Sequence, residues 1–250
     1  MCGIVGYVGT PGQSKPALGV VIDALRRMEY RGYDSAGIAL LDGSGGMAVE
    51  KKAGKLDNLV ATVESAGLEN YPATTGIGHT RWATHGRPTD INAHPHVDQL
   101  GKIAVVHNGI IENFAPLRAE LEAQGVEFTS ETDTETVTHL LHAEYYGEGP
   151  NAGNFTASVM AVINRLEGAF TLVIAHADHP DMLMACRRST PLVIGVGEHQ
   201  MFLGSDVAAF IEHTREAVEL GQDNVVTITA DGYTITDFEG NPVEGRPFTI

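Results

Sequence analysis

Cysteine and basic side chains are scarce in this 250-residue sequence. Only Cys2 and Cys186 are present, which is too few for a disulfide framework and is typical of a reducing compartment. Cys186 lies in an apolar run, so we interpret it as a core residue. Sixteen Lys and Arg residues against 32 Asp and Glu residues give a net charge of -16. This balance disfavours nucleic acid or an anionic membrane as a partner, and a small anionic substrate would need a local basic pocket.

Long apolar runs and linkers are also missing from the sequence. No run approaches the ~18 apolar residues needed to span a bilayer, and the first residues lack the basic start and apolar middle of a signal peptide. We therefore expect a cytoplasmic protein. No low-complexity linker divides the chain, so residues 1–250 are interpreted as one domain.

Hydrophobic periodicity predicts many strands joined by short turns, with helices in groups. The predicted strands cover residues 4–8, 36–41, 47–53, 75–81, 102–106, 169–175, 182–187, 192–196 and 201–205, with a final pair from Val225. The main predicted helices begin near Pro16 after a Ser14 cap, pass through Leu117 and through Val137, and span residues 155–166. This pattern is typical of a layered α+β domain with mostly antiparallel sheets.

The first residues could carry a nucleophile. If an aminopeptidase removes Met1, Cys2 holds a thiol and a free α-amine, and their reference pKa values of roughly 8.5 and 7.7 to 8.0 let the amine accept the thiol proton. Gly3 leaves room beside the sulfur. The alternative is that Cys2 is only a small buried residue.

Other polar motifs each allow two interpretations. Asn108 and the Gly109 N–H could form an oxyanion hole, although Asn-Gly is also the commonest tight-turn dipeptide. Arg81 could bind a carboxylate through two parallel hydrogen bonds from its guanidinium, or it could simply lie on the surface. Asp133 could face an ammonium group or cap a helix.

Two other kinds of site are not favoured by the sequence. Five histidines lie close together, but their spacing fits no common zinc pattern, so no metal site is predicted; they are His79, His85, His94, His96 and His107. No Gly-x-Ser-x-Gly elbow supports a serine nucleophile.

Taken together, the motifs resemble those of the class II glutamine amidotransferases, and the resemblance spans essentially the whole chain. Six segments occur in the order found in that family: Cys2-Gly3-Ile4-Val5-Gly6, Arg31-Gly32-Tyr33-Asp34-Ser35-Ala36-Gly37, His79-Thr80-Arg81-Trp82-Ala83-Thr84-His85-Gly86, Asn92-Ala93-His94-Pro95, His107-Asn108-Gly109 and Ser130-Glu131-Thr132-Asp133. Segments 30–34 and 81–85 are similar to those of the branch that makes glucosamine 6-phosphate from fructose 6-phosphate.

The resemblance implies a fold, a reaction and a set of site residues. The implied fold is the N-terminal-nucleophile αββα sandwich, and the implied reaction is hydrolysis of the side-chain amide of L-glutamine, without a cofactor. The implied catalytic residues are Cys2 with its α-amine, Asn108 and Gly109. The implied substrate-binding residues are Arg81, Trp82, Thr84, His85 and Asp133. The implied supporting residues are Arg31, Tyr33 and His94.

The resemblance also implies a partner and leaves rivals open. Family members continue into an isomerase region that receives the ammonia, and this region is absent from the chain, so we expect free ammonia and glutamate as products. We expect the isolated domain to be monomeric and the full-length protein homodimeric. The rivals are the glutaminase half of another class II amidotransferase, a self-processing amidase with a different substrate, and a glutamine-binding regulatory domain if Met1 is retained.

Overall fold

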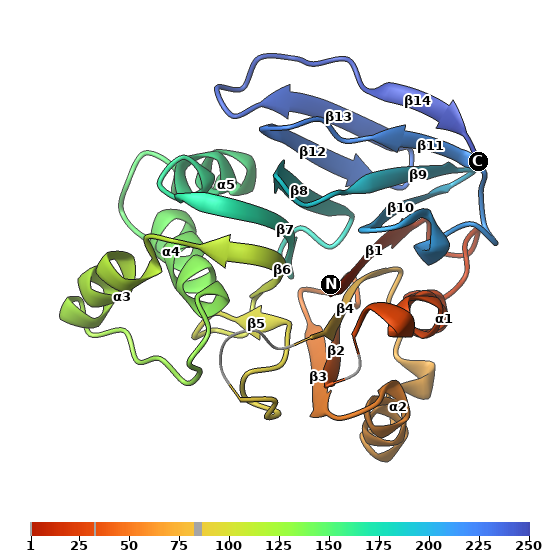
Figure 1. Ribbon diagram of the computed structural model, residues 1–250, viewed down its shortest axis with the longest axis horizontal. Helices are drawn as coiled ribbons and strands as arrows, with labels where there is room; N and C mark the ends of the chain where they lie inside the picture. The colour runs from red at the N-terminus through yellow and green to blue at the C-terminus, as the bar shows by residue number, and fades with distance from the viewer. Residues whose placement is uncertain (1, 33, 83–86) are drawn as a thin grey trace.

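A computed structural model describes residues 2–32, 34–82 and 87–250, and in these ranges two antiparallel sheets pack face to face (Figure 1). The first sheet has eight strands in the order β14 (Arg246–Thr249), β11 (Glu216–Glu219), β9 (Val193–Gly197), β10 (Gln200–Gly204), β1 (Gly3–Gly9), β4 (Thr75–Arg81), β2 (Ser35–Leu41) and β3 (Met47–Ala53). The second sheet has six strands in the order β13 (Gly232–Asp237), β12 (Asn224–Thr229), β8 (Met182–Arg188), β7 (Gly168–His176), β6 (Ile103–Ile111) and β5 (His96–Val97).

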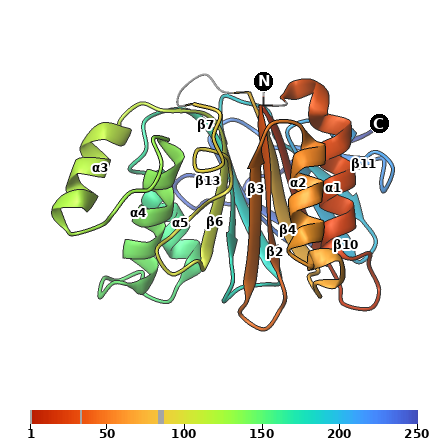
Figure 2. The same cartoon turned by 90° about the horizontal axis from the view of Figure 1, so that it is seen from below.

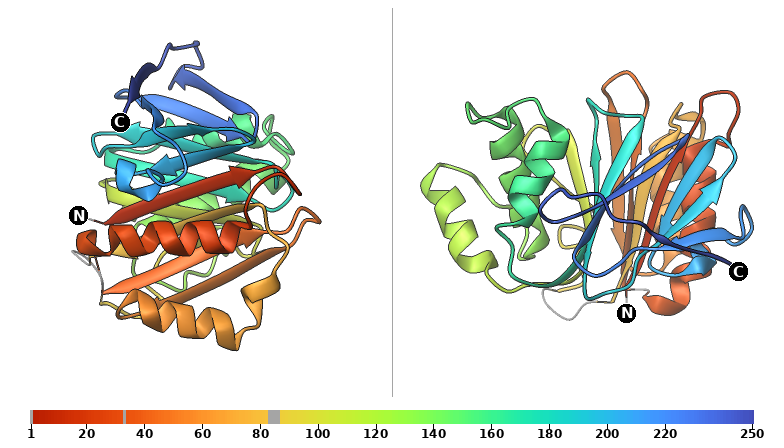
Figure 3. Two further views of the ribbon diagram at one scale, coloured as in Figure 1. Left: turned by 90° about the vertical axis from the view of Figure 1, so that its right-hand side faces the viewer. Right: turned by 90° about the horizontal axis from the view of Figure 1, so that it is seen from above.

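Helices cover the outer face of each sheet. The first sheet carries α1 (Ala17–Met28) and α2 (Leu56–Ser65), followed by the short turns η1 (Glu29–Arg31) and η2 (Leu68–Asn70), and η3 (Val207–Ala209) packs beside α1. The second sheet carries α3 (Phe114–Ala123), α4 (Thr134–Tyr146) and α5 (Phe155–Ile163). Figure 2 shows the resulting order of helices, sheet, sheet and helices, and Figure 3 shows α1 and α2 lying across the first sheet. The predicted αββα sandwich is therefore confirmed.

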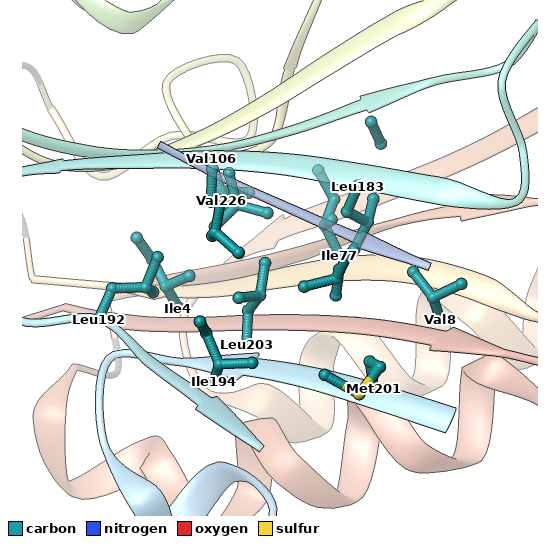
Figure 4. Packing of buried hydrophobic residues seen from close by; sticks show 14 of the residues in the cluster. Ile4, Val8, Ile77, Val106, Leu183, Leu192, Ile194, Met201, Leu203 and Val226 are labelled. Carbon is teal, nitrogen blue, oxygen red and sulfur yellow. The ribbon is translucent and has the colours of Figure 1, made fainter. Parts of the chain in front are cut away.

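Apolar side chains fill the space between the sheets. This inter-sheet layer contains the residues labelled in Figure 4: Ile4, Val8, Ile77, Val106, Leu183, Leu192, Ile194, Met201, Leu203 and Val226. Each buried aliphatic side chain of this size contributes about 1.5 to 3 kcal/mol relative to exposure, so the layer is a main source of folding free energy. Two further apolar layers join each sheet to its own helices.

The alternation of strand residues decides where the polar site lies. Because side chains two apart share a face of a strand, the inter-sheet face continues along three strands beyond its apolar part. The last apolar residues on this face are Ile4 of β1, Ile77 of β4 and Val106 of β6, and the next residues are Cys2, His79 and Asn108. β1 and β4 pair with Ile4 opposite His79, which brings these polar residues to the same end of the layer.

Three local predictions differ from the structure. The strand predicted to end at residue 106 continues to Ile111, with Asn108 opposite Thr171 and Gly109 opposite Phe170, so the tight-turn interpretation of Asn-Gly is wrong. Pairing with β7 overrides the local turn preference of this dipeptide. The helix predicted over residues 155–166 ends at Ile163. Ser14 does not cap α1, because its hydroxyl donates to the Thr10 carbonyl and the helix begins at Ala17 after Pro16.

Candidate active site

A cavity of about 440 Å³ opens at the polar end of the inter-sheet layer. All the predicted site residues that the structure describes line it: Cys2, Arg31, Arg81, Trp82, His94, Asn108, Gly109 and Asp133. The structure thus brings together segments that lie up to 131 residues apart in the sequence. Met1, Tyr33, Thr84 and His85, which also entered the prediction, lie outside the described residues.

Cys2 presents its sulfur beside the backbone of Trp82. The Trp82 N–H donates to Sγ over 3.1 Å, and the thiol can donate to the Trp82 carbonyl at 3.6 Å. Burial raises the pKa of the Cys2 thiol, and the Trp82 N–H and the nearby Arg81 charge oppose that rise only in part. The thiol is therefore mainly protonated at neutral pH, so nucleophilic attack by this sulfur requires a base.

Asn108 connects the second sheet to the cysteine of the first. Its Nδ2 donates to the Cys2 carbonyl over 2.9 Å, while its Oδ1 lies 2.9 Å from His79 Nε2. The residue is 8 % exposed, so it is nearly buried yet lines the cavity. Its NH₂ group is therefore held against the backbone of Cys2.

Gly109 has a backbone that other residues cannot adopt without strain. Its φ is +113°, and a Cβ added there would lie 2.0 Å from the Ala169 carbonyl oxygen on the paired strand β7. Both observations require glycine at this position. The glycine therefore allows β6 to keep its pairing while it passes the cavity.

Arg81 closes the first-sheet side of the cavity at the end of β4. The residue is 5 % exposed, and its Nη1 lies 3.4 Å from the Arg87 carbonyl. Its backbone is fixed by the Asp34 N–H, which donates to the Arg81 carbonyl, and by Gly32, where a Cβ would lie 2.7 Å from the Arg81 carbonyl carbon. Of the two interpretations of Arg81, the one that leaves it on the surface is therefore wrong.

Asp133 lies across the cavity, immediately before α4. Its side chain makes no capping hydrogen bond to the helix. Oδ2 instead accepts the Ile111 N–H of β6 over 2.8 Å, and the side chain remains 22 % exposed. The capping interpretation is therefore wrong, and the carboxylate is tied to the strand that carries Asn108. Arg81 and Asp133 place one cation and one anion on the same cavity.

Arg31 and Trp82 form part of the rim. Arg31 Nη2 pairs with Asp206 Oδ2 at 2.9 Å, and the same carboxylate oxygen accepts the Tyr30 hydroxyl at 3.0 Å. These contacts join η1 to the turn before η3. The Trp82 side chain is 49 % exposed, so a large apolar ring stands at the mouth of the cavity.

Four buried histidines cluster at the cavity: His79, His94 and His107 line it, and His96 packs against His94. The His94 ring centroid lies 4.4 Å from that of His79, 4.9 Å from that of His96 and 6.4 Å from that of His107. Burial lowers the pKa of all four rings, that of His79 to about 3, so they are neutral at pH 7. Within residues 2–32, 34–82 and 87–250, no group of His, Cys, Asp or Glu is placed to hold a metal ion.

Sequence reasoning missed several residues of the cavity wall. Those missed include Ile110, Phe114, Glu131, Thr190, Pro191 and Ser205. Ser205 accepts the Ile4 N–H over 3.0 Å and so fixes the start of β1. Strand periodicity could have assigned His79 to the face shared by Ile77 and Arg81, but nothing local marks Ser205, whose partner lies 201 residues away.

Comparison with known proteins decides the family. The family model described as "Glutamine amidotransferase domain" matches residues 79–212, which is more than half of the chain. The chain belongs to the glutamine amidotransferase domain family. This membership confirms the resemblance inferred from the ordered motifs.

The curated relatives carry one enzyme name. The chain is 67% identical over 244 residues to the glutamine–fructose-6-phosphate aminotransferase [isomerizing] of Mycolicibacterium smegmatis, covering 96% of this chain and 38% of the relative. It is 58% identical over 253 residues to the protein of that name from Streptomyces coelicolor, covering all of this chain and 39% of the relative. The chain thus spans about two fifths of the length of these relatives.

Solved structures of the family share the fold. The glutamine phosphoribosylpyrophosphate amidotransferase from B. subtilis superposes with a TM-score of 0.77 at 24% identity, covering 96% of this chain and 50% of that one. A glutamine aminotransferase class-II domain protein from Silicibacter pomeroyi gives a TM-score of 0.56 at 16% identity, covering 95% and 99%. In the described part of the chain, no helix is long and apolar enough to cross a membrane.

Proposed function

We propose that residues 1–250 form a glutaminase domain that hydrolyses the side-chain amide of L-glutamine to glutamate and ammonia. One observation carries the proposal: Cys2, Asn108, Arg81 and Asp133 all line one cavity of about 440 Å³, and the Asn108 NH₂ group donates to the Cys2 carbonyl. This set provides a nucleophile, a donor for a developing oxyanion, and one charge for each end of an α-amino acid. Family membership and the relatives' name support the same reaction.

Charge complementarity supports glutamine as the substrate. Arg81 is proposed to bind the α-carboxylate through its planar guanidinium, and Asp133 to bind the α-ammonium group. Trp82, with Thr84 and His85 of the adjoining segment, is proposed to cover the bound substrate. Arg31, Tyr33 and His94 are proposed to support these side chains. A substrate that lacks either α-charge would leave a charge of the cavity unpaired, and such a substrate should be rejected.

The chemistry requires that Met1 be removed, because only then does Cys2 have a free α-amine. This amine takes the thiol proton as the sulfur attacks the side-chain amide carbon of glutamine. The oxygen of the tetrahedral intermediate accepts hydrogen bonds from Asn108 Nδ2 and the Gly109 N–H. The C–N bond then breaks, the protonated amine gives its proton to the leaving nitrogen, and ammonia departs. Water attacks the resulting γ-glutamyl thioester, releasing glutamate and restoring the thiol.

The relatives suggest where the ammonia goes. They are more than twice as long as this chain and carry the name of an isomerizing aminotransferase. We propose that an isomerase region joined to this domain uses the ammonia to convert fructose 6-phosphate to glucosamine 6-phosphate, and that the full-length protein is a homodimer. The alternative acceptor of another amidotransferase is distinguished by assaying acceptor synthesis in the full-length protein.

Ammonia and glutamate release from L-glutamine, measured with the chain after Met1 removal, tests the proposal. Intact mass after treatment with an electrophilic glutamine analogue, followed by peptide mapping, reports Met1 removal and Cys2 reactivity together. One adduct on Cys2 and stoichiometric release of both products are expected. Glutamine binding without product release by the Met1-free chain would instead support a regulatory domain, and turnover of amides without α-charges would support a different amidase.

A further inference from the structure

His79 lies directly behind the Asn108 carboxamide, on the side away from the cysteine. It is 0% exposed, and its Nε2 lies 2.9 Å from Asn108 Oδ1. The register of β4 against β1 places it opposite Ile4, two residues after the last apolar side chain of β4 that faces the inter-sheet layer. The His79 ring therefore contacts the oxygen of the Asn108 carboxamide, while Cys2 contacts the nitrogen of the same carboxamide.

The contacts of Asn108 determine which atom of the amide faces which neighbour. The Cys2 carbonyl can only accept a hydrogen bond, so the atom 2.9 Å away from it is the NH₂ nitrogen. The other amide atom is therefore the oxygen, which also only accepts. It follows that His79 Nε2 carries the hydrogen of this contact.

The surroundings keep the His79 ring in one protonation state. The ring packs 4.4 Å from the His94 ring, and burial lowers the pKa of His79 to about 3. Of the two neutral tautomers, only the one protonated on Nε2 can donate to Asn108. A neutral donor suits this position, because a positive charge would lie buried near the Arg81 guanidinium.

We propose that His79 is a positioning residue for the oxyanion hole, whose Nε2–H holds the Asn108 carboxamide with its NH₂ group toward Cys2. This NH₂ group carries two hydrogens, so it can donate to the Cys2 carbonyl and to a developing oxyanion. Without His79 the amide oxygen loses its donor, so that only the hydrogen bond to the Cys2 carbonyl still fixes the carboxamide. The inference rests on the proposed glutaminase function.

The alternative is a histidine that merely fills the core, and a matched pair of substitutions separates the two roles. Glutamine and methionine have similar length and flexibility, but only glutamine carries an N–H donor. His79→Met should lower kcat about 10- to 100-fold with KM within about threefold, since a lost oxyanion-hole donor costs about 100- to 1000-fold and misplacement costs part of that. His79→Gln should recover most of the turnover.

A double-mutant cycle makes the test specific to Asn108. If His79 acts through Asn108, His79→Met should change kcat less than about threefold in the Asn108→Ala background. An equal loss in both backgrounds, or an unchanged kcat in the single variant, would overturn the inference. His96→Met is the matched control, because His96 belongs to the same buried cluster but bonds to Thr132 and not to Asn108; its kcat should stay within about threefold of the parent.

A measurement on the unsubstituted protein does not depend on whether the variants fold. Nitrogen NMR of histidine-labelled protein, assigned with His79→Gln, should show the His79 ring protonated on Nε2 alone at pH 7. Protonation on Nδ1 would overturn the inference. Failure of the unsubstituted, Met1-free chain to release ammonia would reject the proposed function, whereas normal release with an unaffected His79→Met variant would reject only the role of His79.

Discussion

The two cysteines lie in regions of opposite character. Cys2 stands at the polar end of the inter-sheet layer, half-buried, with its sulfur beside a backbone N–H and a cavity. Cys186 lies in β8, fully buried in the apolar layer between the second sheet and its helices, opposite Leu172 and Val225. Burial raises the pKa of both thiols, that of Cys186 to about 12. A perturbed pKa therefore does not distinguish a nucleophile from an inert thiol; access and polar neighbours do.

Alanine substitutions at the two cysteines should give the largest difference in activity. Cys2→Ala should lower ammonia release at least about 10⁴-fold, because no other group can form the thioester, as for other deleted nucleophiles. Cys186→Ala should leave kcat within about threefold and lower the free energy of unfolding by about 1 to 2 kcal/mol through a small cavity. Steady-state assays and urea unfolding check both. Comparable losses of activity in the two variants would contradict the comparison.

Alkylation of the native protein measures how accessible each of the two thiols is to a reagent in solution. Iodoacetamide should modify Cys2 at least about 100-fold faster than Cys186, because a buried thiol reacts only after local opening. Because burial raises the pKa of the Cys2 thiol above its ordinary value, the Cys2 rate should still be rising at pH 9. Peptide mapping at timed intervals measures both rates. Faster labelling at Cys186 would mean that the apolar layer opens more readily than the cavity admits the reagent.

Neighbouring positions on β6 extend the comparison to a single strand. Asn108 faces the cavity end of the inter-sheet layer, whereas Val105 is fully buried on the helix side. Asn108→Ala should lower kcat about 100- to 1000-fold, and it should also lower the unfolding free energy by about 1 to 3 kcal/mol because the partners of the lost amide are left unsatisfied. Val105→Ala should leave kcat within about threefold but lower the unfolding free energy by about 1 to 3 kcal/mol. A large loss of kcat in Val105→Ala, with kcat retained in Asn108→Ala, would refute the assignment of faces.

Acid should destabilise the folded protein through the four clustered histidines at the cavity. The four clustered histidines have pKa values below the ordinary 6.5 in the folded state. As pH falls below 6.5, these histidines therefore bind protons in the unfolded chain but not in the folded chain, and this favours unfolding. Their contribution is fully present above pH 6.5 and decreases below it, by about 1 kcal/mol per histidine near pH 5.5. Cys186 does not titrate in this range.

Urea unfolding between pH 7.5 and 5.5 measures this effect. His96→Met removes one of the four rings. The part of the acid-induced loss of unfolding free energy that comes from the cluster should therefore be smaller by about one quarter. An unchanged pH slope in this variant would show that His96 is not held neutral by burial.

The sequence predicted most of the architecture and eight of the residues that line the cavity. The predicted strands match β1, β2, β3 and β4 closely; β1, β2 and β4 are buried along their whole length, whereas every residue of β3 is partly exposed. The ordered motifs indicated the family, although periodicity alone left Arg81 and Asp133 ambiguous. Both residues line the cavity.

What could not be predicted depends on distant partners. The Asn-Gly pair is locally turn-forming, and only its pairing with Thr171 and Phe170 makes it strand. Asp133 bonds to Ile111 of a different element, which no helix-capping rule anticipates. The histidines have ordinary spacing in the sequence, and their neutrality arises from burial, which exists only in the folded chain.

The hydrogen bond from Asn108 to the Cys2 carbonyl joins the two sheets at the cavity. With Cys2 as the proposed nucleophile on one sheet and Asn108 as the proposed oxyanion donor on the other, the thickness of the apolar layer between the sheets would set the gap across which a tetrahedral intermediate must fit. Core residues of this layer such as Leu203 and Val226 would then act as spacers of the proposed catalytic groups. Selection on turnover then constrains core volume as well, and redesigns that keep stability while altering sheet separation should lose rate.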